Sequence, residues 1–573
     1  MILPRFFGIV TLPTKGRSRR VLPLLALSFG LLLLAGYHAY GRWVERRLGP
    51  DDARVTPAHE KSDGQDFVPT PRFYLFAQHL SAIAAAGPIA GPILAARDFG
   101  WLPCLLWIAL GVVLIGAVHD FSALFASVRH GACSIAEVTR STLGGPAGRA
   151  LMGFIAIALV YVIVAFADIT AGSFAVGTEE LALVAPAFHP GGAVALASVL
   201  YLGLAIVMGL VQRWLRPPLW VVTIVFVPAT FAVVWFGTQH SDWLRCDQRT
   251  WGLLILGYCV AAAVTPVWAL LQPRGYLGGF VLFTALAAGL AGVLFGGHAI
   301  QQPAFKGWEA ASGPLFPFLF VTIACGACSG FHGLVCSGTT SKQVARETHV
   351  RFVGYGAMLA EGLLAFLALA TLMIAKDDEL RGLAPGTIYG NGLGRFLTLF
   401  VGAEHLRFAT TFGAMAFSTF VFDTLDVCTR LGRYLVQELF GWRGRPGAVA
   451  ATLVTMAPPA LVLARSEPGA YRDYWTLFGA SNQMLAALTL FAVGFWLLRA
   501  RRPSRFVFLP MLFVLGMTSW ALARILITSA AKAGGNVPAL VNAIASGALL
   551  CLAAFLLWTG VRRLRAVTVS QPG

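Results

Sequence analysis

The feature that most constrains this chain is the recurrence of apolar runs, each about 20 residues long, between Val21 and Val561. A helix of that length crosses the roughly 30 Å hydrocarbon core of a bilayer. About fifteen such runs are present, and 57% of the 573 residues are hydrophobic while 12% are charged, about half the charged fraction of an average soluble protein. The sequence therefore predicts an all-α polytopic membrane protein with about 15 transmembrane segments. It excludes a soluble enzyme, a disulfide scaffold and a disordered chain.

The net charge of +17 fits the loops of a membrane protein better than a nucleic-acid-binding surface. Short cytoplasmic loops of such proteins carry an excess of Lys and Arg. When the loops are assigned alternately to the two sides, one side carries more than twice as many Lys and Arg as the other. This asymmetry predicts a cytoplasmic C-terminus, with the lipid bilayer as a partner and no nucleic acid.

Two of the apolar runs are poor candidates for continuous helices. The first contains two Gly-Pro steps within Gly87–Pro92, and proline removes a backbone donor and clashes with the preceding turn. The second, Cys325–Lys342, is rich in glycine and hydroxyl residues and has a histidine in its middle. Unwound backbone at membrane depth persists only where it is buried in protein or lines a wet cavity. We therefore expect two discontinuous helices.

The two interrupted segments occupy corresponding positions in the chain. Each opens a group of five apolar runs, and the alternation of sides gives the two groups opposite orientation, as in transporters built from an inverted repeat. This pattern predicts five parts: an N-terminal anchor span and cytoplasmic connector (1–72), a first five-helix repeat (73–237), a two-span insertion (238–314), a second inverted five-helix repeat (315–498) and two peripheral C-terminal spans (499–573).

Several motifs together resemble the carbon starvation protein A family of inner-membrane transporters. They are Gly87–Pro92, His119-Asp120-Phe121, Ser134–Glu137, Ile323–His332, Ser337–Lys342, Asp426–Arg430 and Trp475–Leu485. The resemblance implies import of peptides or of small carboxylates such as pyruvate when carbon is scarce. It also implies coupling to a cation, with a proton expected before sodium, and a fold like that of the amino acid–polyamine–organocation superfamily. His119 stands where the family has Gln and Ser341 where it has Pro, which leaves the substrate open.

The breaks in the two helices are the predicted substrate site. Half-helix N-termini attract carboxylates, and glycine permits both the unwinding and a close approach to the backbone. The candidates are Gly87, Gly91, Gly326, Ser329, Gly330, His332, Gly333, Ser337, Thr339 and Thr340. The alternative is that the glycines only permit close helix packing, while the hydroxyls bond back to their own helix.

Charged groups at membrane depth are costly, and they usually face the interior of a helix bundle. The predicted ion-coupling residues are Asp120, Asp168, Asp426 and His332. A carboxyl withdrawn from water holds a proton more readily, and histidine titrates near neutral pH. The alternative for the carboxylates is static pairing with Arg129, Lys342 or Arg430. Glu361 also lies within an apolar run, with no role assigned to it.

Six further polar residues are predicted to support the site: His79, His119, Lys342, Arg430, Asn482 and Gln483. The two amides are expected to tie helices together, and Lys342 to anchor its helix at the cytoplasmic boundary.

No cofactor, metal or catalytic residue is predicted. Cys325 and Cys328 lack a second pair at zinc spacing, and no phosphate-binding loop is present. The sequence thus favours a secondary active transporter over an enzyme, with a channel or an intramembrane redox subunit as the alternatives. It leaves open proton against sodium, and pyruvate against peptide.

Overall fold

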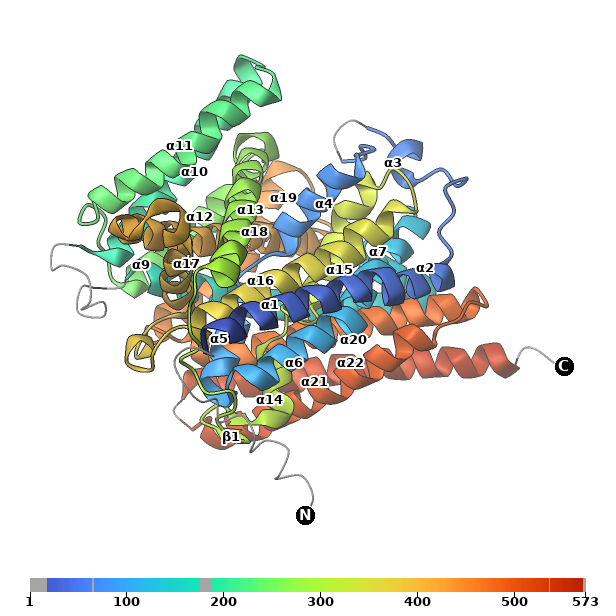
Figure 1. The fold of residues 1–573 in the computed structure, drawn as a ribbon. Coiled ribbons are helices and arrows are strands. Elements are labelled where there is room, and N and C mark those ends of the chain that lie inside the picture. Colours follow the sequence, from blue (N-terminus) through green and yellow to red (C-terminus); the bar gives the residue numbers. More distant parts are fainter. Residues whose placement is uncertain (1–17, 64–65, 176, 178–187, 535, 570–573) are drawn as a thin grey trace.

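The computed structural model describes residues 18–63, 66–175, 177, 188–534 and 536–569, most of which lie in helices (Figure 1). Residues 1–17 of the expected N-terminal anchor lie outside the described residues. Two short strands occur in the described part, β1 (Glu309–Ala310) and β2 (Gly313–Pro314), which pair antiparallel with Ala310 opposite Gly313. The prediction of an all-α membrane fold is confirmed.

Twelve helices in the described part are long and apolar enough to cross a bilayer. They are Arg19–Leu48 (α1, Ser18–Ala35, and α2, Arg42–Leu48, joined by a π-helical turn), Trp101–Arg129 (α6, Trp101–Gly111, and α7, Ala117–Arg129, joined in the same way), Gly145–Phe174 (α9), Pro190–Trp214 (α10), Leu219–Gln239 (α11), Leu271–Phe295 (α13), Arg351–Met373 (mostly α16, Gly356–Met373), Ala403–Phe440 (mostly α18, Leu406–Phe440), Gly444–Arg465 (α19), Tyr471–Arg499 (α20), Arg505–Lys532 (α21) and Val537–Arg563 (within α22, Val537–Val569). The bent pair α4 (Arg72–Ile83) and α5 (Gly87–Phe99) makes thirteen.

This number is below the fifteen spans expected, because two apolar runs do not form one long helix each. Helix α12 (Gln248–Val264) has 17 residues, about 26 Å at 1.5 Å per residue, which is short of the hydrocarbon thickness. The run 315–339 is divided into α14 (Leu315–Thr322) and α15 (Gly330–Gly338). Hydropathy identifies both runs as apolar but does not show where the backbone unwinds.

Both segments with interruptions in the sequence pattern are interrupted in the structure. Helix α4 ends at Ile83, and α5 begins at Gly87 with its axis bent by 46°. Pro88 is the second residue of α5, where the missing N–H has no intrahelical partner to lose. In the second segment the backbone leaves the helix after Thr322 and reaches Ser329 in an extended conformation (φ −128°, ψ 127°).

The two interrupted helices pack against each other at their breaks. Helix α5 contacts α14, and α4 contacts α15. A Cβ added at Gly91 would lie 2.6 Å from the carbonyl oxygen of Thr322, and one at Gly87 would collide with Cys325. Close approach of the backbones here therefore requires glycine. This opposed pairing is the arrangement that an inverted repeat would produce, and the repeat itself stays a prediction.

Helix α17 (Pro385–Val401) was not predicted, because its sequence is too polar and too rich in glycine to form an apolar run. It packs along α18 and α13. Gly390 and Gly394 lie one helical turn apart and face Ala414 and Thr410 so closely that a Cβ would lie 2.8 Å from the Ala414 methyl and 2.6 Å from the Thr410 hydroxyl. Small residues at this spacing permit close helix contact.

Short elements connect the long helices. Helix α8 (Ile135–Leu143) begins at Ser134, whose hydroxyl accepts a hydrogen bond from the Glu137 N–H at 3.3 Å, as in an N-cap. The other short elements of the described part are α3 (Pro57–Glu60), the 3₁₀ turns Val267–Ala269, Thr340–Gln343, Asp378–Leu380 and Ala403–His405, and the π-helical turns Gly36–Gly41, Val112–Gly116 and Arg351–Tyr355.

Helices α18 and α20 lie in the core of the bundle. In the most apolar part of α18 and of α20, 89% of the residues are buried inside the protein, against 22% in α11. Figure 1 shows α10 and α11 as a hairpin at one edge and α21 and α22 along the opposite edge. Of the interrupted helices, α5 and α15 are almost wholly buried, whereas the start of α4 is exposed at Phe73 and Tyr74.

Candidate functional site

A buried row of titratable side chains lies beside the second interrupted helix. Three elements supply its central members: Asp120 on α7, His332 on α15 and Glu361 on α16. His332 Nδ1 lies 2.9 Å from Asp120 Oδ2, and His332 Nε2 lies 3.3 Å from Glu361 Oε2. All three side chains are at most 1% exposed. The imidazole of an interrupted helix thus bridges two carboxyl groups that belong to two other helices.

The Asp120 carboxylate also contacts a second imidazole, that of His119 on the same helix. His119 Nδ1 lies 2.8 Å from Asp120 Oδ1, so each carboxylate oxygen faces one imidazole nitrogen. An ionised carboxylate only accepts hydrogen bonds, and both histidines therefore carry a proton on Nδ1 when Asp120 is charged. The ring of His119 also packs against Gly333, where a Cβ would lie 3.3 Å from it. Asp120 is the fixed anchor of the row.

His79, on α4, lies beside the C-terminal end of α15 and is a further titratable residue near the buried row. Its Nδ1 lies 2.9 Å from the Thr340 hydroxyl, and the Sγ of Cys336 lies 3.9 Å from its Nε2 and 3.6 Å from the carbonyl oxygen of Asp120. His79 and Thr340, predicted for separate roles, are therefore direct partners. Their contact joins the first half of one interrupted helix to the end of the other.

Asn482 and Gln483 on α20 hold the break between α14 and α15. Asn482 Oδ1 accepts a hydrogen bond from the Phe331 N–H at 2.8 Å, and its Nδ2 donates to the Ser329 hydroxyl and to Cys325 Sγ, each at 3.1 Å. Gln483 Nε2 donates to the Phe320 carbonyl at 3.0 Å. The two amides satisfy backbone and side-chain groups that the unwinding leaves without helical partners.

The glycines proposed for substrate contact are buried against neighbouring segments in this structure. Gly87 faces Cys325, Gly91 faces the Thr322 carbonyl, and a Cβ at Gly326 would lie 3.0 Å from Ala365. A Cβ at Gly330 would lie 2.5 Å from Leu485 Cβ and closer still to the Asn482 carbonyl. Their role in substrate contact stays a prediction, because it requires the two breaks to separate.

The hydroxyl candidates divide into two groups. Ser337 and Thr339 bond back to their own helix, to the carbonyls of Gly333 at 2.7 Å and Val335 at 3.1 Å. Ser337 also accepts a hydrogen bond from the Ile135 N–H at the start of α8, at 3.0 Å. Ser329 and Thr340 instead contact side chains of other helices, as described above.

Asp168 lies apart from the row, near the C-terminal end of α9. Its Oδ2 accepts a hydrogen bond from the Tyr471 N–H at the start of α20 at 2.8 Å, and its Oδ1 accepts one from Gln248 Nε2 at 2.9 Å. The carboxylate thus joins the ends of α9, α12 and α20. These contacts indicate a structural role, and the predicted role in ion coupling remains untested.

A second charged cluster surrounds Arg274, which is 1% exposed within α13. Its Nε lies 2.9 Å from Asp423 Oδ1, and its Nη1 lies 2.6 Å from Asp426 Oδ2. Tyr258 donates a hydrogen bond to the same Asp426 oxygen at 3.0 Å. Sequence reasoning missed Arg274, because it lies between Pro273 and Gly275 and resembles a loop residue.

The basic residues named as alternative partners of the buried carboxylates make their hydrogen bonds and ion pairs with other groups in this structure. Arg129 Nε lies 2.6 Å from Glu347 Oε1, and Lys342 Nζ lies 3.6 Å from the exposed Asp66. Arg430 Nη2 donates to the carbonyls of Ala262 and Thr265 at 2.6 and 2.8 Å. Arg433 Nη1 donates to the Ala263 carbonyl at 2.6 Å. The two arginines on α18 thereby satisfy the last carbonyls of α12.

Among the described residues, no group of three or more His, Cys, Asp or Glu side chains is placed to hold a metal ion. Cys325 and Cys328 are both buried as free thiols, and Cys325 accepts the hydrogen bond from Asn482 noted above.

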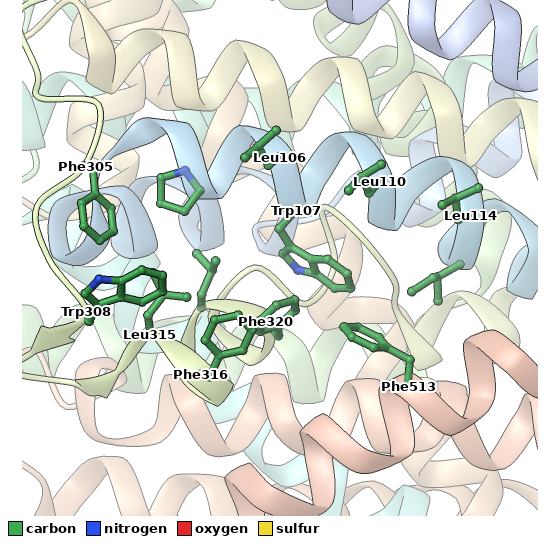
Figure 2. Close-up of a pocket in the computed structure, with 13 residues that line it drawn as sticks. Leu106, Trp107, Leu110, Leu114, Phe305, Trp308, Leu315, Phe316, Phe320 and Phe513 are labelled. Atoms are coloured by element: carbon green, nitrogen blue, oxygen red, sulfur yellow. The ribbon is translucent and has the colours of Figure 1, made fainter. Parts of the chain in front are cut away.

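An apolar groove of about 350 Å³ is separate from these clusters. Figure 2 shows Leu106, Leu110 and Leu114 along one wall, with Phe320 and Phe513 opposite them. The three leucines, on α6 and on the π-helical turn Val112–Gly116 that follows it, are 42–53% exposed, as expected for a surface that faces lipid. The groove shares no residue with the titratable row, so the functional site is identified by side-chain chemistry rather than by the size of a cavity.

The fold and these contacts define a class of protein: a polytopic membrane protein in which two interrupted helices meet beside buried titratable side chains. The chain belongs to the carbon starvation protein CstA family, whose sequence profile matches residues 21–386 and 382–521.

Three relatives show the range of names in the family. The chain is 30% identical to the pyruvate/proton symporter BtsT of Escherichia coli (strain K12), over 91% of this chain and 84% of that protein. It is 31% identical to the peptide transporter CstA of Mycobacterium tuberculosis (strain H37Rv), over 81% of this chain and 70% of that protein. It is 34% identical to the peptide transporter CstA of Bacillus subtilis (strain 168), over 80% of this chain and 82% of that protein. The chain is thus a multi-pass membrane transporter of a bacterial membrane.

Proposed function

We propose that this chain is a secondary active transporter that imports a small carboxylate such as pyruvate, or a short peptide, together with protons. The observation that carries the proposal is the position of His332, which lies in an interrupted helix between Asp120 and Glu361. A titratable row of this kind, buried at membrane depth, is typical of proton pathways in transporters. The description of the family as carbon starvation proteins supports import when carbon is scarce.

The relatives support this choice of substrate class and coupling ion. One is named for pyruvate and protons, and others are named for peptides. Both kinds of substrate carry a carboxylate, which matches the half-helix N-termini at the breaks. In the structure described here the Asn482 side chain already accepts the Phe331 N–H at the start of α15. Substrate binding at this N-terminus therefore requires α20 and α15 to shift relative to each other.

The proposal includes two five-helix units of opposite orientation, with one change from the boundaries derived from the sequence. Helix α20 closes the second unit and packs against α9, α7 and the interrupted helix of its own unit. Helix α13 makes the corresponding contacts in the first unit, with α18, α16 and α4. This correspondence supports α13 as the fifth helix of the first unit. Helix α12 packs on α9, α18 and α19, as α19 packs on α18, α9 and α12, which supports α12 as the fourth helix and the α10–α11 hairpin as the insertion. The C-terminus is proposed to face the cytoplasm.

Uptake into proteoliposomes tests the proposed function. Radiolabelled pyruvate and dialanine are offered under an inward proton gradient, an inward sodium gradient or no gradient. One pH unit supplies about 1.4 kcal/mol per proton, enough for about tenfold accumulation of a substrate carried with one proton. We expect accumulation under the proton gradient alone, abolished by nigericin and absent from protein-free liposomes. Flux that equilibrates the substrate under every condition would identify a channel and overturn the proposal.

A further inference from the structure

We propose that Glu361 and His332 share the transported proton, and that this proton holds α15 against α16. The inference deepens the proposed function, on which it rests, by naming the proton carrier and the helix contact that the proton controls. It assigns the carrier role to Glu361 and a positioning role to Asp120.

The contacts of the two carboxyl groups differ in a way that separates their roles. Asp120 faces an imidazole Nδ1 with each of its oxygens, at 2.8 and 2.9 Å. Both oxygens of Glu361 lack a hydrogen-bond partner of good geometry in the described part of the chain, and so does His332 Nε2, which lies 3.3 Å from Glu361 Oε2. Asp120 is therefore stable as an anion, whereas Glu361 depends on a single long contact.

The chemistry of that contact requires a proton. With Asp120 ionised, the Nδ1 hydrogen of His332 points to Asp120, which leaves Nε2 facing Glu361. When one proton is present between them, either Nε2–H donates to a carboxylate or a carboxylic O–H donates to Nε2. When the proton leaves, the Nε2 lone pair and the carboxylate face each other at 3.3 Å. A buried acceptor without a donor is unfavourable, so loss of the proton favours separation.

The surroundings of the pair offer no substitute for that proton. The charged groups that act on Glu361 in the described structure are His332 and Asp120, and one of these is another anion. The buried thiols of Cys325 and Cys328 also lie near it and carry no cation. The groups that act on His332 are the two carboxyls, with His79 of α4 nearby. Asn482 of α20, which holds the start of α15, is uncharged. Release of the proton thus leaves two negative charges in a buried site.

The consequence for transport follows from the position of α15. This half-helix carries His332 and begins at the break predicted to contact substrate, and it packs against α4 and α20 as well as α7. Loading one H⁺ gives a satisfied pair and a closed contact between α15 and Glu361 of α16. Releasing the same H⁺ regenerates the carboxylate and a neutral imidazole, and it frees α15 to move. Proton binding and movement at the substrate site are thereby linked.

The test compares Glu361→Gln with wild type in proteoliposomes, in two assays. The amide is uncharged and its NH₂ group donates to His332, as the protonated acid does, so we expect the rate of exchange of radiolabelled pyruvate (dialanine where pyruvate is not carried) to lose the pH dependence that wild type shows. Accumulation under an inward proton gradient should fall from about tenfold per pH unit to about onefold. The matched control is Glu347→Gln, a carboxylate of similar burial that pairs with Arg129, and it should accumulate like wild type.

Each outcome has a distinct meaning. Gradient-driven accumulation by Glu361→Gln at the wild-type level overturns this inference and leaves the proposed function intact. Absence of proton-driven accumulation in wild type overturns the proposed function itself. If Glu361→Gln does not fold, Glu361→Asp decides, because it keeps an acid but withdraws it by one methylene from a contact already 3.3 Å long. We expect a shifted pH profile of uptake in that variant, and an unchanged profile counts against the shared proton.

Discussion

The guanidinium of Arg274 and the carboxylate of Asp426 form a buried ion pair, with Nη1 and Oδ2 separated by 2.6 Å and both side chains at most 1% exposed. The same guanidinium also binds Asp423, so one cation on α13 serves two anions on α18. Removing one member of such a group leaves uncompensated charge in a medium that does not solvate it.

Replacement of the arginine should therefore be severe. Arg274→Met leaves Asp423 and Asp426 without their cation, and we expect a loss of about 3–5 kcal/mol in the free energy of unfolding. Denaturation in mixed micelles measures the loss. The triple variant Arg274→Met, Asp423→Asn, Asp426→Asn removes all three charges and should recover most of it. A single variant as stable as wild type would contradict the pairing.

Gly330 and Gly338 offer a matched pair of glycines at the two ends of α15. An added Cβ at Gly330 meets the Asn482 carbonyl and Leu485, whereas at Gly338 it meets nothing within 4 Å. Gly330→Ala should lower stability by about 1–3 kcal/mol, the usual cost of overpacking, and Gly338→Ala should leave stability nearly unchanged. Thermal unfolding of the two purified variants makes the comparison, and equal midpoints would show that α20 does not pack on α15 as described.

Asn482→Ala removes the side chain that bonds to the break between α14 and α15. It leaves the Phe331 N–H without its partner, at a cost of about 1–3 kcal/mol for a buried donor. Transport should fall with stability, because the break loses its support. The control is the neighbour Ser481→Ala, since the Ser481 hydroxyl bonds only to its own helix, at the Phe478 carbonyl. A similar effect of both substitutions on the unfolding midpoint would argue against a specific role for Asn482.

Asp168→Asn distinguishes structural support from ion coupling at the end of α9. The introduced amide would have one acceptor oxygen, which can still accept the Tyr471 N–H. Its NH₂ group would then face the Gln248 Nε2 donor, so the second hydrogen bond is lost unless the Gln248 amide turns over. We expect reduced thermal stability together with proton-driven accumulation at the wild-type ratio. Loss of accumulation with exchange retained would instead restore the coupling role predicted from the sequence.

The sequence predicts the parts of this protein that depend on local chemistry. Gly87 and Pro88 interrupt one helix because of what those residues are, and the membrane fold follows from hydropathy. The partners of Arg274 lie 149 and 152 positions away on α18, so no local pattern reveals them. The sequence identifies Glu361 as a charged residue at membrane depth, but the role proposed for it depends on its contact with His332 of another helix. Helix α17 was missed because glycine spacing, not hydropathy, adapts it to α18.

The shortness of α12 has a consequence for the lipid around it. A helix of 17 residues is shorter than the hydrocarbon core, so it cannot bring both of its ends to the water that would cover their backbone groups. Arg430 and Arg433 supply fixed donors in place of that water. A short helix can thus end inside the bundle with its last carbonyls satisfied by side chains of α18, without thinning of the bilayer being required for their hydration.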